Sequence, residues 1–308
     1  MVSQATQVQF SQVHIDIARN ATDDFNLFHD SHRWARIFQN PFHGPIALGF
    51  QIESLIENKI HQYRLENNEN NFITKNNLNF SNYQFSFANA IKPGQNITID
   101  VKETKIASDS KNPSLSNRVS VKSDNKLALI GFKKETRLPL FFSESKFSTI
   151  GDVLKTYSDR SFIGIKENSF FLKRKFMNVS DAKNFLCGSL VDQRMFFDEL
   201  ENKYQFPEIF PCAFISCALL EKFMMKKLDF ERSPMVYLSH KISIDRQLLS
   251  TLKSNDRLHV LIRLQTEKKS QTNIQVYECY GLLENNAILF RALVELIPLE
   301  DILKTVKK

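Results

Sequence analysis

Two side chains that can exchange protons lie close together near the start of the chain. In residues 22–30, the carboxyl group of Asp24 stands five residues before the imidazole of His29, with the amide of Asn26 between them. Carboxylate and imidazole side chains are common general acids and bases. On this spacing alone, a surface turn capped by an Asx residue explains the same residues more simply.

A predicted helix follows sixteen residues after His29. Residues 45–50 read Pro-Ile-Ala-Leu-Gly-Phe and open a largely apolar segment, with proline near the favoured first helical position. A helix that is apolar nearly all round belongs in a core. A backbone N–H of Gly49 at this N-terminus would stabilise negative charge on a carbonyl oxygen, although the glycine could equally serve close helix packing. The acid, the base and the helix N-terminus together predict chemistry on a polarised carbonyl group.

The predicted elements of the first half recur in the same order in the second half. The apolar helix of residues 45–57 has a counterpart in residues 211–221, which also open with proline. The strand-like segments that follow at matching places are residues 91–101, 118–122 and 126–132, and residues 252–262, 274–278 and 287–293. This repeat predicts two α+β units, residues 1–145 and 146–308, each with a curved antiparallel sheet wrapped around a central helix.

Composition narrows the classes of function. Of 308 residues only 8 are glycine, and neither of the Gly-rich phosphate-binding motifs occurs. The net charge of +7 suits an acidic partner, such as a phosphorylated cofactor arm or an acidic carrier protein, although simple solubility would explain it as well. Because the Lys and Arg residues are scattered without an aromatic-rich basic motif, no nucleic-acid partner is predicted.

Membrane insertion and metal centres are not predicted either. No run approaches 18 apolar residues and the first ten residues are polar, so we expect a cytoplasmic protein that does not enter a membrane. The 4 cysteines form no CxxC pair, and we predict that they are reduced core residues rather than metal ligands.

These motifs resemble those of the MaoC-like hot-dog family, which contains (R)-specific enoyl-CoA hydratases and 3-hydroxyacyl-thioester dehydratases. Residues 24–29 carry the family's Asp, Asn and His at the family spacing. Residues 45–49 match the segment that opens its central helix, and residues 85–94 resemble the entry to its following strand. The departures from the family pattern are Thr22-Asp23 for Ser-Gly, Leu27 for Pro and Leu48 for His. The acid and the base themselves are retained.

The resemblance implies a double hot-dog fold and a hydro-lyase. Its reaction would be the reversible dehydration of a 3-hydroxyacyl thioester, on CoA or acyl carrier protein, to the trans-2-enoyl thioester in fatty-acid or polyketide-type metabolism. The implied catalytic residues are Asp24 and His29, the implied substrate contacts are Asn26, Leu48 and Gly49, and no metal or redox cofactor is needed. A non-catalytic acyl-thioester-binding or scaffold subunit and a hot-dog thioesterase are alternatives. The chain would act as a monomeric pseudo-dimer or as a homodimer.

The second unit lacks a matching acid–base pair. Aligned without gaps on the prolines of the two helices, it places Leu190 at the position of Asp24 and Met195 at the position of His29. A shift of one residue gives serine and arginine there instead, and none of these side chains exchanges a proton near pH 7. The second unit is therefore predicted to be catalytically degenerate, which leaves one active site per chain.

Two arginines of the second unit are candidates to bind the phosphate of a phosphopantetheine arm. Arg174 lies in a Lys-Arg-Lys run, and Arg194 lies within the degenerate motif. Guanidinium groups bind phosphate oxygens through paired hydrogen bonds. A solvated or ion-paired arginine is the simpler interpretation of each.

Overall fold

Each half of the chain contributes helices and strands to a common architecture. A computed structural model describes residues 7–109, 111–141, 153–165, 168–265 and 273–306. The first half contains α1 (Gln12–Thr22), α2 (Gly49–Glu66), α3 (Asn70–Lys75), β1 (Phe80–Phe87), β2 (Ile97–Val101), β3 (Lys105–Ala107), β4 (Ser114–Ser123) and β5 (Lys126–Thr136). The second half contains α4 (Val153–Thr156), β6 (Arg160–Ile165), β7 (Asn168–Met177), α5 (Val179–Gly188), β8 (Phe197–Asp198), β9 (Lys203–Tyr204), α6 (Ile209–Met225), β10 (Met235–Asp245), α7 (Arg246–Thr251), β11 (Asp256–Leu264), β12 (Gln275–Leu282), β13 (Ile288–Pro298) and α8 (Leu299–Val306).

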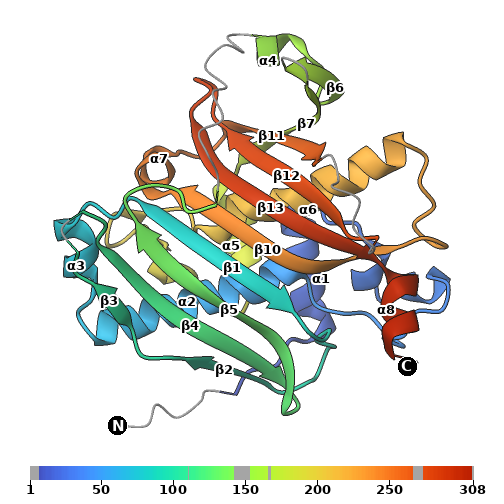
Figure 1. Ribbon diagram of the computed structural model, residues 1–308, viewed down its shortest axis with the longest axis horizontal. Coiled ribbons are helices and arrows are strands. Elements are labelled where there is room, and N and C mark those ends of the chain that lie inside the picture. The colour runs from blue at the N-terminus through green and yellow to red at the C-terminus, as the bar shows by residue number, and fades with distance from the viewer. Residues whose placement is uncertain (1–6, 110, 142–152, 166–167, 266–272, 307–308) are drawn as a thin grey trace.

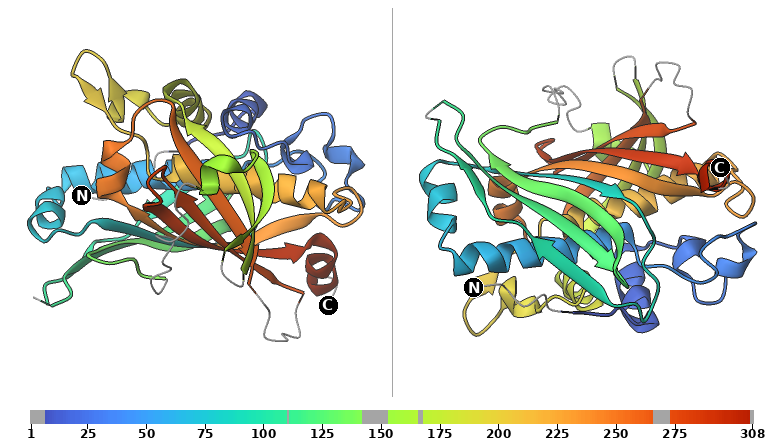
Figure 2. Two further views of the ribbon diagram at one scale, coloured as in Figure 1. Left: turned by 90° about the horizontal axis from the view of Figure 1, so that it is seen from above. Right: turned by 60° about the horizontal axis from the view of Figure 1, so that its bottom comes forward.

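The two halves share one continuous antiparallel sheet. In the part of the chain that the structure describes, its order is β2-β4-β5-β1-β10-β13-β12-β11-β7-β6, with β3 also paired to β4. The halves meet where β1 pairs with β10, from Phe80 opposite Asp245 to Ser86 opposite Ser239. Figure 1 shows the sheet curving over α2 and α6, and both helices lie on the same face of it in Figure 2.

The two central helices, α2 and α6, bury different kinds of side chain. Helix α6 is apolar along most of its length, and residues 209–223 are all buried. Helix α2 buries polar side chains as well, and three of them bond to the second half. Gln51 Nε2 donates to the carbonyl of Gly188 (2.6 Å), Glu53 bonds Nδ1 of His240 (2.7 Å), and Glu57 accepts backbone N–H groups at the start of α6. Because buried polar groups need such partners, these bonds fix the two halves in one arrangement.

A second pair of helices, α1 and α5, packs beside the central pair. The helices approach closely at Gly188, the last residue of α5. A side-chain carbon at that position would lie 2.7 Å from the backbone nitrogen of Ala18 and 2.7 Å from the carbonyl oxygen of His14. Glycine therefore sets the distance at which α1 and α5 pack. This matters for function because α1 leads directly into the motif of residues 24–29.

The predicted α+β architecture of two tandem units, each with a sheet around a central helix, is confirmed. Helix starts differ from the sequence prediction, since α2 begins at Gly49, four residues after Pro45, and Pro211 is the third residue of α6. The proposed boundary between residues 145 and 146 lies outside the described residues, so it stays a prediction.

Several elements have no counterpart in the sequence analysis. The sequence analysis did not predict helices α1, α3 and α5 or strand β10. Three of the cysteines are buried as predicted, but Cys187 is exposed. Among the described residues, no helix is long and apolar enough to cross a membrane.

Candidate active site

The loop after α1 turns Asp24 and His29 toward the interior. Helix α1 ends with Asp23 in the left-handed conformation (φ 52°), and the Asp24 N–H bonds the carbonyl of Arg19 (3.0 Å). Asp24 Oδ1 then accepts the Asn26 N–H (3.2 Å), and Asn26 Oδ1 accepts the Phe28 N–H (3.2 Å). In this loop of consecutive Asx turns, residues Asp24 and His29 are only 2% and 5% exposed.

The two buried groups face each other without a direct hydrogen bond. His29 Nε2 lies 3.8 Å from Asp24 Oδ2. His29 Nδ1 lies 2.8 Å from the carbonyl oxygen of Ile46, which can only accept, so this nitrogen carries the proton. Burial lowers the pKa of His29 below its ordinary value of 6.5, more than the nearby Asp24 raises it. The neutral imidazole therefore directs the lone pair of Nε2 toward the carboxylate.

Helix α1 clamps this loop through one arginine. Arg19 Nε donates to the Asp24 carbonyl (3.0 Å), and its Nη2 forms an ion pair with Asp30 (2.9 Å). Gln12 Nε2 adds a bond to the carbonyl of His29 (3.2 Å). The sequence analysis missed these residues, because their role depends on the close packing of a helix that it did not predict. They hold the acid and the base in fixed positions, as general acid–base catalysis requires.

The N-terminus of α2 stands next to this pair. Leu48 caps the helix with its backbone, and its N–H donates to Gln51 Oε1 (3.3 Å). No described group accepts the N–H of Gly49. A side-chain carbon at Gly49 would lie 3.2 Å from the ring of Phe87 and 3.5 Å from that of Tyr237. Both interpretations of this glycine are thus compatible with its surroundings, which combine tight packing with an available N–H.

A cavity of about 570 Å³ opens onto these groups. This volume lies within the range of small-molecule sites. Of the residues predicted to act on or bind substrate, His29, Asn26 and Gly49 line the cavity. Leu48 is buried and is not part of the lining. Asp24 also lies outside the lining and adjoins the cavity through His29, whose Nε2 it faces.

The second half completes the cavity with a pair of hydroxyl groups. Ser216 Oγ on α6 lies 2.7 Å from the phenol oxygen of Tyr237 on β10, and both residues line the cavity. Burial, followed by the charge of nearby Asp24, raises the pKa of Tyr237 well above 10. The phenol therefore stays protonated, and the pair retains a hydrogen that it can donate to a ligand. No motif in the sequence marks these residues.

No protein-family model matches the chain, and no curated protein matches it. Several solved structures are similar over nearly the whole chain, among them the following three. A MaoC-like dehydratase is 8% identical and has a TM-score of 0.59, with 96% of each chain covered. A conserved protein from Mycobacterium tuberculosis described as having a double hot-dog fold is 12% identical, has a TM-score of 0.57, and matches over 96% of this chain and 94% of its own. A MaoC-like dehydratase from Phytophthora capsici is 9% identical, with a TM-score of 0.51 and 94% of each chain covered.

The chain has a double hot-dog fold. The similarity to the two dehydratases is a similarity of fold, as their sequence identities to the chain are 8% and 9%. The fold predicted from the motifs of residues 24–29, 45–49 and 85–94 is thereby confirmed.

The double hot-dog repeat lets the two loops be compared residue by residue. Helix α5, like α1, is followed by a left-handed residue, Leu190 (φ 58°), and the Val191 N–H then bonds the carbonyl of Leu186. Val191 thus stands where Asp24 does, so the ungapped alignment of Leu190 with Asp24 is wrong. The cause is one residue fewer between the left-handed residue and the cap of the short helix, since residues 24 and 25 separate Asp23 from Asn26 whereas only Val191 separates Leu190 from Asp192. Valine, like leucine, cannot exchange a proton.

The short helices themselves align as predicted. Asn26 caps the 3₁₀ helix η1 (Leu27–His29), and Asp192 caps the 3₁₀ helix η3 (Gln193–Met195) in the same way. Met195 therefore occupies the place of His29. The second loop of the double hot-dog keeps the cap and the turn while it lacks both titratable groups.

The backbone N–H groups at the N-terminus of α6 are hydrogen-bonded by a side chain. The Glu57 carboxylate, from the middle of α2, accepts the N–H groups of Glu208 (2.8 Å) and Ile209 (3.1 Å). Burial and the neighbouring Glu208 raise the pKa of Glu57 to about 7. Lys133, which lies 3.0 Å from Glu208, and Tyr83, which bonds it at 2.5 Å, hold the pKa of Glu208 to about 2 against the effect of its burial.

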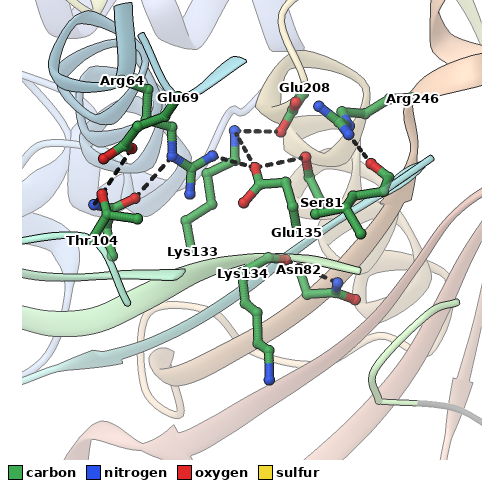
Figure 3. A network of polar contacts seen from close by, with 12 residues as sticks. Arg64, Glu69, Ser81, Asn82, Thr104, Lys133, Lys134, Glu135, Glu208 and Arg246 are labelled. Atoms are coloured by element: carbon green, nitrogen blue, oxygen red, sulfur yellow. Dashed lines mark hydrogen bonds and ion pairs between the residues drawn. The ribbon is translucent and has the colours of Figure 1, made fainter. Parts of the chain in front are cut away.

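A larger buried network extends from this point into the first unit. Figure 3 shows Lys133 between Glu208 and Glu135, with Arg64 and Ser81 also bonded to Glu135. The network closes the position that, in the other half of the double hot-dog, opens onto the cavity.

Neither arginine predicted to bind phosphate lies on the cavity. Arg194 is exposed and pairs with Asp192 of its own loop (2.7 Å). Arg174 is engaged by Asp159 (2.8 Å) and by the carbonyls of Leu154 and Tyr157. The structure gives both the ion-paired role that was the simpler interpretation of these residues.

Proposed function

We propose that this protein is a hydro-lyase that catalyses the reversible dehydration of a 3-hydroxyacyl thioester to the trans-2-enoyl thioester. Asp24 and His29 act as its acid–base pair. The substrate is bound to CoA or to an acyl carrier protein, in fatty-acid or polyketide-type metabolism of the cytoplasm. The observation that carries this proposal is the buried, hydrogen-bond-fixed pair of a carboxylate and a neutral imidazole, 3.8 Å apart, beside a helix N-terminus whose N-cap residue, Leu48, forms no side-chain cap.

The helix N-terminus supplies the electrophilic half of the reaction. A thioester carbonyl that accepts the Gly49 N–H places developing negative charge at the positive end of the α2 dipole. This charge arises when the bond between Cα and its proton breaks, because the electrons pass into the carbonyl as an enolate. The N–H therefore bonds more strongly in the transition state than in the ground state, which is the requirement for catalysis.

The acid–base pair performs the proton transfers. In dehydration, one member of the pair removes a proton from Cα, and a proton passes to the 3-hydroxyl group, which leaves as water. In hydration, Nε2 of His29 and Oδ2 of Asp24 both accept hydrogen bonds from one water molecule, which attacks Cβ while a proton returns to Cα. The same groups serve both directions by microscopic reversibility. The cavity walls, which are largely apolar, restrict water to the reacting position.

A hydration assay tests this proposal. Purified protein is mixed with crotonyl and longer enoyl thioesters, and the loss of absorbance of the conjugated enoyl group is followed together with the release of free thiol. We expect absorbance loss without thiol release. Thiol release would instead identify a thioesterase, in which water attacks the carbonyl. Binding of the thioester by well-folded protein, with no change in either signal, would identify a non-catalytic acyl-binding or scaffold subunit.

A further inference from the structure

The cavity has one polar end and one apolar end. The polar end comes from the loop after β1 and from the β4–β5 turn, with Asn89, Lys92, Gln95, Ser123 and Lys126. The apolar end comes from the second unit, with Leu219, Leu220, Phe223, Leu228, Phe230 and Met235. Gly49 packs between Phe87, which leads into the polar loop, and Tyr237, which follows the apolar segment. The reacting carbonyl would therefore lie between the two ends.

The polar end is held by its own hydrogen bonds. Asp124 and Asn125 adopt positive φ angles (45° and 66°) in the tight turn between β4 and β5. The Asp124 carboxylate accepts the Asn96 N–H (2.9 Å) and Gln95 Nε2 (3.0 Å). Gln95 Oε1 in turn accepts the N–H of Lys92 (2.7 Å). The loop and the turn form one rigid rim, and the nearby acidic group is engaged within it.

Two cations and one hydroxyl of this rim lack protein partners in the described part of the chain. Lys92 is half-buried and Lys126 is exposed, and no described carboxylate forms an ion pair with either. Other lysines near the core behave differently, since Lys133 and Lys173 both pair with glutamates. Ser123 Oγ is buried, lines the cavity, and has no described hydrogen-bond partner. An unpaired buried hydroxyl costs stability unless a ligand bonds it.

We propose that Lys92, Lys126 and Ser123 bind the phosphate that CoA and carrier-bound phosphopantetheine have in common. Two ammonium groups and a hydroxyl supply the charge and the donors that a phosphate ester requires. The inference rests on the proposed function, because it takes the pantetheine arm to run from the carbonyl beside Gly49 to the polar end. It replaces the two arginines of the second unit as phosphate ligands.

Binding of the free arm tests the subsite without turnover. Titration calorimetry compares 4′-phosphopantetheine with pantetheine on the wild type and on the Lys92→Gln/Lys126→Gln variant. We expect the wild type to prefer the phosphorylated arm by about tenfold, and the variant to show no preference. The control is Lys105→Gln/Lys122→Gln, which removes two exposed charges that do not line the cavity and should keep the preference. No preference in the wild type, or the same preference in the double variant, overturns the subsite.

Kinetics separate the source of the phosphate from the proposed function. The same enoyl group is presented on CoA, on a carrier protein and on pantetheine. In the Lys92→Gln/Lys126→Gln variant, we expect KM to rise about tenfold for the phosphorylated substrate, CoA-bound or carrier-bound, that the wild type uses best. We expect kcat/KM on enoyl-pantetheine, which lacks the phosphate, to stay within about twofold of the wild-type value. Equal losses on all three would contradict the subsite. If the wild type turns over none of them yet binds phosphopantetheine preferentially, the proposed reaction fails while the subsite stands.

Discussion

The two helix N-termini at the centre of the molecule have opposite surroundings. At α2, Gly49 presents an N–H beside a neutral imidazole and lines a cavity. At α6, the corresponding N–H groups bond the carboxylate of Glu57, and Lys133 pairs with Glu208 next to it. A helix N-terminus attracts negative charge in either case. One unit leaves that attraction for a ligand, and the other satisfies it with a buried side chain.

The difference teaches that fold and chemistry are separable within this chain. The cap that starts the short helix is present in both loops, as Asn26 in one and Asp192 in the other. The proton-exchanging groups are present in only one of them. The capped short helix therefore forms in the second loop without counterparts of Asp24 and His29, which is the pattern expected of residues kept for reaction rather than for stability.

Asp24→Asn should show the largest difference between the loops. The amide cannot accept a proton, so we expect kcat/KM for enoyl-thioester hydration to fall at least about 10³-fold, with folding retained. Asp192→Asn makes the same chemical change in the second loop and should leave the rate within about twofold, because it recreates the asparagine cap of the first. Circular dichroism melting would check that both variants fold. Equal losses in the two variants would remove the distinction between the loops.

Lys133→Met should destabilise the fold without changing the catalytic rate per folded molecule. It removes the ammonium group that pairs with the buried Glu208 and Glu135, and breaking such a buried pair costs about 3–5 kcal/mol of unfolding free energy. Lys134→Met is the matched control, since Lys134 points to the opposite side of β5 in Figure 3 and should change stability little. Urea denaturation measures both. A loss of catalytic rate per folded molecule, rather than of stability, would show that this network serves the reaction.

The pH dependence of activity should reflect the lowered pKa of His29 in the first loop. His29 must be neutral to accept a proton, and its lowered pKa keeps it neutral below pH 6.5. We therefore expect the acidic limb of kcat/KM to have its midpoint below 6.5, with activity lost as pH falls through the folded pKa. This midpoint belongs to the coupled pair with Asp24 rather than to one group. A midpoint above 6.5 would mean that folding raises the pKa of the His29 imidazole instead of lowering it.

Tyr237→Phe should have the smallest effect. It removes one hydroxyl of the pair with Ser216, and a hydrogen bond of this kind is worth about 1 kcal/mol, or about fivefold in kcat/KM. Tyr83→Phe removes the tyrosine that bonds Glu208 at the other helix N-terminus. It should lower the melting temperature and leave kcat/KM unchanged. If the two variants had the same kinetic effect, the hydroxyl pair would have no special place in the cavity.

The sequence predicted those parts of the molecule that depend on local pattern. The spacing of Asp24 and His29, the presence of a central helix near Gly49 and the repeated strands all follow from short-range regularities. The clamp by Arg19 was missed together with helix α1, and the hydroxyl pair of Ser216 and Tyr237 was missed because it depends on the packing of β10 against α6. The phosphate-binding hypothesis for Arg174 and Arg194 arose because charge in the sequence does not say which carboxylate a side chain meets, and these side chains pair with Asp159 and Asp192.

The most direct measurement compares His29→Ala with Met195→Ala in the hydration of an enoyl thioester. Both substitutions truncate the last residue of a short helix, one in each loop. The account predicts that His29→Ala loses at least about 10³ in kcat/KM while Met195→Ala stays within about threefold of the wild type. A wild-type rate in His29→Ala, or an equal loss in Met195→Ala, would contradict a single active site in the first unit.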